Sequence, residues 1–131
     1  MSNVTTILLD TTVLIDALRR RNRRNELLVE WLSSGHSLAT STVNIAEVYD
    51  GIHPGEEDAT HAVLAELEWF PVSGAIAKRA GHLQATLRRQ GQTRGIADMI
   101  VAATALENGF PVATENRKDF KVEGLTLLPL P

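Results

Sequence analysis

Acidic and amide side chains occur in this sequence where apolar segments begin or end. Asp10 follows the apolar run 7–9, and Asp98 lies two residues after Ile96, where a strongly apolar segment begins. Asn116 and Asp119 come shortly after another short apolar segment. An aspartate at a helix start is commonly a cap or a dipole-stabilising anion, but a carboxylate on a buried helix needs a partner. If the apolar segments form a parallel sheet, its topology can bring these side chains to one edge.

Carboxylates gathered at one edge repel one another unless a cation neutralises them. Hard divalent ions such as Mg²⁺ or Mn²⁺ suit oxygen ligands and complete their coordination with water. Such ions activate water as a nucleophile and stabilise charge that builds on a phosphate. The pattern therefore predicts phosphodiester hydrolysis by activated water, without a covalent enzyme intermediate. Glu47 lies in the middle of a helical pattern, and taken alone it is explained as a solvent-facing residue.

Short apolar runs alternate with segments of helical spacing along the whole chain. We predict strands at residues 7–9, 36–40, 70–72, 111–114 and 125–128. We predict helices at residues 13–20, 25–34, 42–50, 56–69, 74–90 and 96–108. The last of these helices is apolar on all sides, which is typical of a helix inside the fold. The alternation predicts an α/β protein with a central parallel sheet in a three-layer α/β/α arrangement.

Composition excludes several classes of protein. The chain has 131 residues, so we expect one domain over residues 1–131. It is 44% hydrophobic and 22% charged, which is ordinary for a globular protein. It has no cysteine, which excludes a disulfide framework, a thiol nucleophile and a cysteine zinc site. The start lacks the pattern of a signal peptide and no apolar stretch reaches the roughly 18 residues of a membrane span, so we expect a cytoplasmic protein.

Positive charge is concentrated near residue 20. The net charge of −3 is not that of a general nucleic-acid binder, yet five arginines stand close together: Arg19, Arg20, Arg21, Arg23 and Arg24. Such a stripe can follow phosphates locally, or it can be the solvated end of a helix. The four histidines are scattered and lack the close spacing of a zinc site, so we assign them no catalytic role.

The ordered set of motifs resembles the PIN domain family. ILLDTTVLIDAL resembles the opening strand and helix of that family, and STVNIAEVYDGI, which contains Glu47, resembles its second motif. GIADMIVAATALENGFPVATENRKDF, which contains Asp98, resembles the third and fourth motifs together. The resemblance extends over about residues 7–128. Size and motif style are most like the VapC-type toxins of toxin–antitoxin pairs.

The resemblance implies a Mg²⁺- or Mn²⁺-dependent endoribonuclease that is inhibited by a VapB-type antitoxin and is commonly a homodimer. It implies that Asp10 and Asp98 bind metal directly and that Glu47 binds a metal or its water. Thr11 and Thr114 would be hydroxyls that hold these carboxylates in place. The arginine stripe would contact the RNA backbone or an acidic tail of the antitoxin.

The chain departs from the family pattern at one position. PIN domains often have a fourth acid where Asn116 stands here, and an amide brings an oxygen but no charge. Asp119 would compensate through water or would position the loop. We therefore expect one tight metal and a second that is weak or dependent on RNA.

Three other functions are each compatible with part of the sequence. A phosphotransfer enzyme with an aspartyl phosphate needs a second aspartate two residues after Asp10, where this chain has Thr12. A PIN-like module without activity is favoured only by the missing fourth acid, and the three intact acids argue against it. A nuclease that acts on DNA is equally compatible with these residues.

Overall fold

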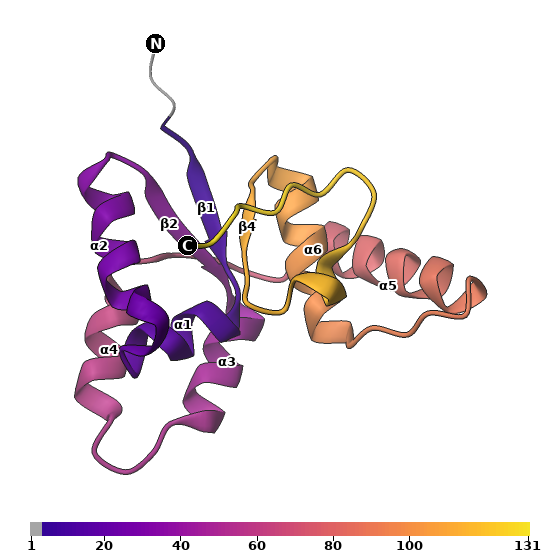
Figure 1. The fold of residues 1–131 in the computed structure, drawn as a ribbon. Helices are drawn as coiled ribbons and strands as arrows, with labels where there is room; N and C mark the ends of the chain where they lie inside the picture. The colour runs from indigo at the N-terminus through magenta and orange to yellow at the C-terminus, as the bar shows by residue number, and fades with distance from the viewer. Residues whose placement is uncertain (1–3) are drawn as a thin grey trace.

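The fold is built on a short parallel sheet. The computed structural model describes residues 4–131 (Figure 1). The sheet has the order β3-β2-β1-β4 and all three strand pairings are parallel. Its strands are β1 (Thr6–Leu9), β2 (Ser37–Ser41), β3 (Glu68–Phe70) and β4 (Val112–Ala113). The first three residues of the expected domain lie outside the described residues, and a single domain over 1–131 stays a prediction.

Helices cover both faces of the sheet. They are α1 (Thr11–Leu18), α2 (Arg24–Ser33), α3 (Thr42–Gly51), α4 (Glu57–Ala65), α5 (Gly74–Arg89) and α6 (Ile96–Asn108), with short 3-10 helices at Arg21–Arg23 and Arg117–Phe120. Figure 1 shows α1, α2 and α4 on one side of the strands and α5 and α6 on the other. This arrangement confirms the predicted three-layer α/β/α class. Within residues 4–131, no helix is long and apolar enough to cross a membrane.

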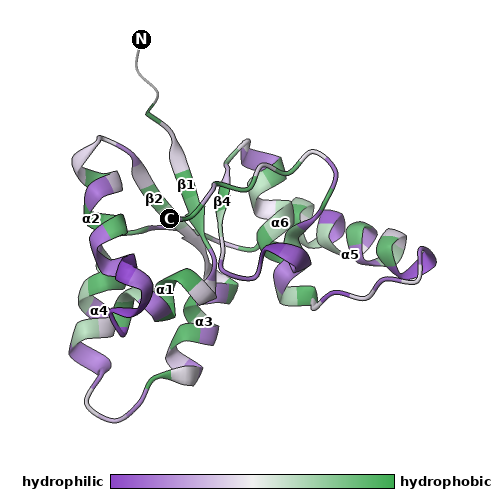
Figure 2. Ribbon diagram, viewed as in Figure 1, coloured by the Kyte–Doolittle hydropathy of each residue, from purple (hydrophilic) through white to green (hydrophobic). Residues whose placement is uncertain are grey.

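The core is divided between the two faces by the alternation of side chains along β1. Leu8 packs in one cluster with residues of α5 and α6, whereas Ile7 and Leu9 pack in the other with residues of α1, α2, α3 and α4. All three are at most 1% exposed. Figure 2 shows the apolar character of β1 and of α6. A strand buried on both faces is a continuous apolar run, which is why residues 7–9 predict the centre of the sheet.

The boundary between two neighbouring predicted elements lies earlier in the chain than the sequence indicates. The helix predicted at 56–69 ends at Ala65, and the strand predicted at 70–72 is instead β3, which pairs Trp69 with Thr40 of β2. The indole N–H of Trp69 donates to the carbonyl of Leu64 at 2.9 Å, so this side chain satisfies a carbonyl at the helix end. Aromatic residues favour a strand over the last turn of a helix.

The last predicted strand is wrong. Residues 125–128 form only an isolated parallel bridge, between Leu127 and Val112. The N–H of Leu128 donates to the carbonyl of Val112 at 2.9 Å, so the segment runs beside β4 without extending a full ladder. β4 itself spans two residues and is shorter than the predicted 111–114. Thr114 therefore lies just beyond the end of the strand.

Candidate active site

Asp10 lies at the carboxyl end of the central strand. Its N–H donates to the carbonyl of Ala113 at 3.0 Å, which joins the ends of β1 and β4. Asp10 occupies the position before α1, but its side chain makes no capping hydrogen bond. Oδ2 instead accepts from the hydroxyl of Thr12 at 2.9 Å and from that of Thr114 at 2.8 Å. A nearly buried carboxylate, 4% exposed, is thus oriented by two hydroxyls rather than used as a helix cap.

The same two hydroxyls accept hydrogen bonds from the loop after β4. The N–H of Glu115 donates to Thr12 Oγ1 and that of Asn116 donates to Thr114 Oγ1, both at 3.0 Å. Thr12 and Thr114 are 3.3 Å apart at their hydroxyl oxygens. Sequence reasoning named Thr114 but missed Thr12. The repeated hydroxyl in the Asp-Thr-Thr sequence was the signal that could have identified it.

Glu47 is exposed, yet its carboxylate is held by neighbours on two elements. Oε1 accepts from the hydroxyl of Thr11 at 2.8 Å and from the side-chain amide of Asn44 at 3.4 Å. The same amide donates to Thr11 Oγ1 at 2.9 Å. Glu47 thus faces solvent, as expected of it taken alone, but its carboxylate also has fixed partners. Thr11 contacts Glu47, while Thr12 and Thr114 contact Asp10.

Asn44 supports this arrangement from inside the protein, and sequence reasoning did not select it. It is fully buried in α3, and its Oδ1 accepts from the hydroxyl of Thr40 at 3.2 Å and from the N–H of Ser41 at 3.3 Å. These bonds fix the amide so that its N–H₂ faces Thr11. Asn44 stands three residues before Glu47, so both lie on one face of α3. This spacing is the signal in the sequence that could have identified Asn44.

Asp98 lies in the first turn of α6 and is the most strongly perturbed acid. Burial, the largest cause, and the negative charges of Asp10, Asp119 and Glu47 together raise its pKa from the ordinary 3.8 to about 6, while Arg94 lowers it. Repulsion of this kind requires the carboxylates to be neighbours. The structure thus brings together four acids from the end of β1, from α3, from α6 and from the segment after β4.

Asn116 and Asp119 contact each other in that loop. The side-chain amide of Asn116 donates a hydrogen bond to Asp119 Oδ2. Asp119 lies within the 3-10 helix Arg117–Phe120 and adds its charge to the group around Asp98. Asn116 therefore orients a carboxylate that lies three residues after the position of the family's usual acid.

The chemistry of this set of side chains fits a hard divalent cation. All potential ligands are oxygen atoms, and the raised pKa of Asp98 reflects burial first and then neighbouring negative charge that a cation would offset. Within the described residues, no three Asp, Glu or His side chains stand close enough together to hold one ion directly. Mg²⁺ commonly uses one or two protein carboxylates and keeps several waters.

The five arginines do not form one exposed surface. Arg24 is buried, and Arg19 donates to the carbonyl of Gly51 at 3.2 Å and pairs with Glu56 at 3.5 Å. Arg23 pairs with Glu26 at 2.5 Å. In the part of the chain that the structure describes, Arg20 and Arg21 are the members of the stripe that are exposed and outside any ion pair. Contact of the stripe with RNA or with an antitoxin tail stays a prediction.

The chain has clear relatives. The family model described as PIN domain matches residues 7–123. The ribonuclease VapC10 of Mycobacterium tuberculosis is 34% identical over 110 residues, which cover 84% of this chain and 82% of that protein. The ribonuclease VapC19 of the same species is 31% identical over 115 residues, which cover 86% and 90%.

Solved structures share the fold. VapBC2 from Rickettsia felis, bound to a DNA fragment from its promoter, has a TM-score of 0.81 at 24% identity and covers 94% of this chain and 97% of that one. A toxin–antitoxin complex from Klebsiella pneumoniae has a TM-score of 0.78 at 26% identity, with coverage of 95% and 98%. The motif order, the sheet, the acidic cluster and these matches together establish that the chain belongs to the PIN domain family.

Proposed function

We propose that this protein is a divalent-metal-dependent endoribonuclease and the toxin of a VapBC-type toxin–antitoxin pair. The observation that carries the proposal is the convergence of Asp10, Glu47 and Asp119 on Asp98, whose pKa they and burial raise to about 6. It is supported by relatives that are named ribonuclease VapC and by fold neighbours solved as VapBC complexes. The activity is phosphodiester hydrolysis.

The residues of the cluster would have different roles in the reaction. Asp10 and Asp98 would hold the cation, and Glu47 would hold it or one of its waters. A divalent cation bound there supplies positive charge that activates water and offsets charge on the phosphate. Thr12 and Thr114 orient Asp10, while Thr11 and Asn44 orient Glu47. Such supporting hydrogen bonds are worth roughly 10–100-fold in metal affinity or activity.

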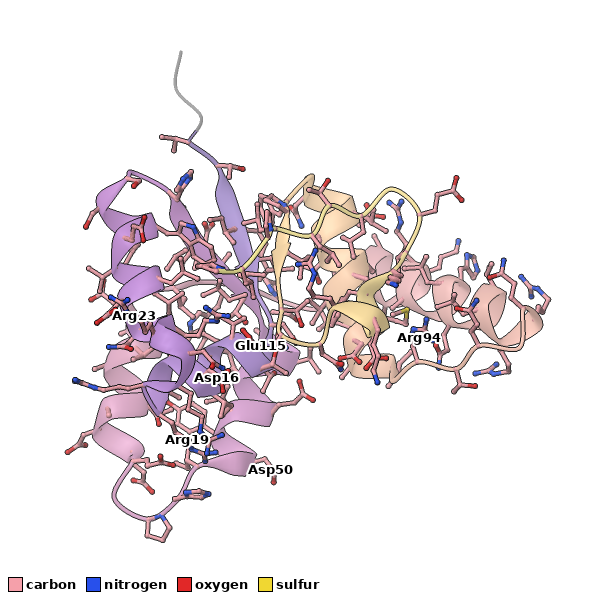
Figure 3. All side chains as sticks on the ribbon, in the orientation of Figure 1. Asp16, Arg19, Arg23, Asp50, Arg94 and Glu115 are labelled. Atoms are coloured by element: carbon pink, nitrogen blue, oxygen red, sulfur yellow. The ribbon has the colours of Figure 1, made fainter. Side chains whose placement is uncertain are left out.

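The first experiment is cleavage of total RNA by the purified protein, freed of antitoxin, with Mg²⁺ or Mn²⁺. Asp98→Asn and EDTA should each abolish discrete cleavage. Asp50→Asn is the matched control, because Asp50 is an exposed acid near the end of α3. Figure 3 shows Asp50 away from Arg94 and Glu115. Cleavage that survives Asp98→Asn would mean contamination or another site. No cleavage by the unmodified protein, across varied RNA, would favour the PIN-like module without activity.

A second experiment separates RNA from DNA as the substrate. Once a cut site is mapped, an oligonucleotide with a single 2′-deoxy substitution at that site is compared with the all-ribose form and with the DNA of the same sequence. An endoribonuclease should cleave the all-ribose form and leave the DNA intact. Equal cleavage of the DNA would replace the proposal by a nuclease of broader substrate.

The partners follow from the same assignment. We propose that a VapB-type antitoxin binds this protein and inhibits cleavage, and that the free protein is a homodimer. Co-expression with the product of an adjacent antitoxin reading frame should yield a complex that has lost the ribonuclease activity. Light scattering of the free protein should give twice the mass of 14.3 kDa for one chain.

A further inference from the structure

Arg24 is a buried cation at the start of α2. Its side chain is 6% exposed, and it faces Glu115 with two nitrogens: Nε to Oε1 at 2.6 Å and Nη2 to Oε2 at 3.3 Å. Its remaining nitrogen, Nη1, donates to the carbonyls of Asn22 at 3.2 Å and of Pro131 at 3.1 Å. All three guanidinium nitrogens are therefore engaged, as burial of a charge requires.

The backbone that leads into Arg24 is strained. Arg20, Asn22 and Arg23 have φ angles of 54°, 52° and 58°, in the left-handed region that residues with a Cβ rarely adopt. The bond from Arg24 to the Asn22 carbonyl holds this turn from inside. Strain of this kind persists only where the surrounding structure imposes it, and it concentrates near functional sites. Here its result is to direct Arg24 inward while Arg20, Arg21 and Arg23 stay exposed.

Glu115 stands next to the acidic cluster but serves a different purpose. It lies between Thr114, which binds Asp10, and Asn116, which binds Asp119. Its carboxylate is occupied by Arg24, so its charge is neutralised by a fixed cation. Figure 3 shows Glu115 between the N-terminal helices and the part of the molecule that contains α5 and α6.

The main chain of Glu115 connects this ion pair to the site. Its N–H donates to Thr12 Oγ1 at 3.0 Å, and Thr12 Oγ1 donates to Asp10 Oδ2 at 2.9 Å. The neighbouring Thr114 donates to the same oxygen at 2.8 Å. Fixing Glu115 therefore fixes the hydroxyl of Thr12 through this hydrogen bond, and it holds Thr114 and Asn116, its two chain neighbours, whose own bond positions the hydroxyl of Thr114.

We propose that Arg24 and Glu115 are positioning residues, whose ion pair holds the loop 114–116 and thereby orients the Asp10 carboxylate for the reaction. The inference rests on the proposed ribonuclease function. It assigns a role in the reaction to one member of the arginine stripe, and that role is not contact with RNA. Both residues act through Thr12 and Thr114 rather than by touching the substrate.

The test measures kcat and KM for cleavage of a defined RNA by Glu115→Gln and by Arg24→Lys. Glu115→Gln should lower kcat by about 10–100-fold and change KM by less than about threefold, because Asp10 is misoriented while the RNA surface is intact. Arg24→Lys should cause a smaller loss than Glu115→Gln, since it keeps the charge but not the paired geometry. The affinity for Mn²⁺, measured by calorimetry without RNA, should fall in parallel.

Two controls separate positioning from loss of stability. Leu27→Ala removes a buried side chain from the same helix, α2, without touching Glu115, and should keep the wild-type kcat at temperatures where it is folded. The loss of kcat caused by Glu115→Gln should be smaller in a Thr12→Ala background than in the wild-type protein. Both changes interrupt the same series of hydrogen bonds from Glu115 through Thr12 to Asp10.

The outcomes are distinguishable. Wild-type kcat in Glu115→Gln, or losses that add fully with Thr12→Ala, would overturn the positioning role while leaving an active ribonuclease. Absence of cleavage by the unmodified protein would overturn the proposed function and this inference together.

Discussion

The hydroxyl of Thr114 donates to the carboxylate of Asp10 at 2.8 Å across 104 positions of sequence. This single bond joins the end of β4 to the end of β1 inside the acidic cluster. Thr114 is fully buried, so its hydroxyl has a fixed direction and no competing solvent. Removing that hydroxyl without changing the shape of the side chain is the sharpest test of how Asp10 is oriented.

Thr114→Val should lower the rate of RNA cleavage by about tenfold, because Asp10 keeps one of its two hydroxyl donors. The measurement is kcat at saturating metal. Thr104→Val is the matched control: Thr104 is equally buried, but its hydroxyl donates to the carbonyl of Ile100 within α6. An equal loss in both variants would show that the effect is one of packing.

The stability of the metal-free protein should rise as pH falls through 6. Asp98 has a folded pKa of about 6 against an ordinary value of 3.8, so the folded state binds more protons than the unfolded state between these values. The destabilisation by its charge is fully present above pH 6, is relieved as pH falls toward 4, and changes no further below the ordinary value. Discounted for solvent screening, the effect is on the order of 1 kcal/mol.

Chemical denaturation in EDTA at pH 7 and at pH 5 measures this effect. Asp98→Asn, which cannot titrate, should lack the gain that the wild-type protein makes between these two pH values. An identical pH dependence in the two proteins would contradict the raised pKa.

Arg94 should hold the pKa of Asp98 down. It is the cation that lowers this pKa, and the N–H₂ of Gln84 fixes its loop by donating to the Arg94 carbonyl. Arg94→Gln should therefore move the pKa of Asp98 above about 6. Side-chain carboxyl NMR over a pH series measures the shift. Arg89→Gln, an exposed arginine at the end of α5, is the control and should leave the titration unchanged.

Binding of metal should reveal the missing charge at residue 116. We expect one tight Mn²⁺ and one weak Mn²⁺ in the absence of RNA. Asn116→Asp should tighten the weak site by about tenfold or more, because a carboxylate is added beside Asp119. Two equally tight sites in the unmodified protein would contradict this expectation.

The same substitution should lower Tm in EDTA, since it replaces the Asn116–Asp119 hydrogen bond with repulsion between two carboxylates. Asn108→Asp adds the same charge at the opposite end of α6, where it also loses the hydrogen bond to the Thr104 carbonyl, and it should leave the metal affinity unchanged. An equal gain of metal affinity in both variants would assign that gain to net charge alone.

Local pattern was enough to predict much of this protein. The run 7–9 has no polar residue, so it predicts a strand buried on both faces, and Asp10 then falls at its carboxyl end. The bounds of α6 agree with the predicted 96–108, because Gly109 ends the helix in the left-handed conformation, with φ of 71°. The positions of Asp10 and Asp98 relative to their elements depend only on residues nearby.

Features that depend on residues far apart in the sequence were decided by the tertiary structure. Glu68–Phe70 is a strand because β2 pairs with it, not because of its own periodicity. Arg24 looks like its four arginine neighbours in the sequence, but a left-handed turn and the distant Glu115 place it inside. Thr12 joins the site only because the loop after β4 folds against it. Partners separated by about a hundred residues leave no periodic signal, so only the folded chain selects them.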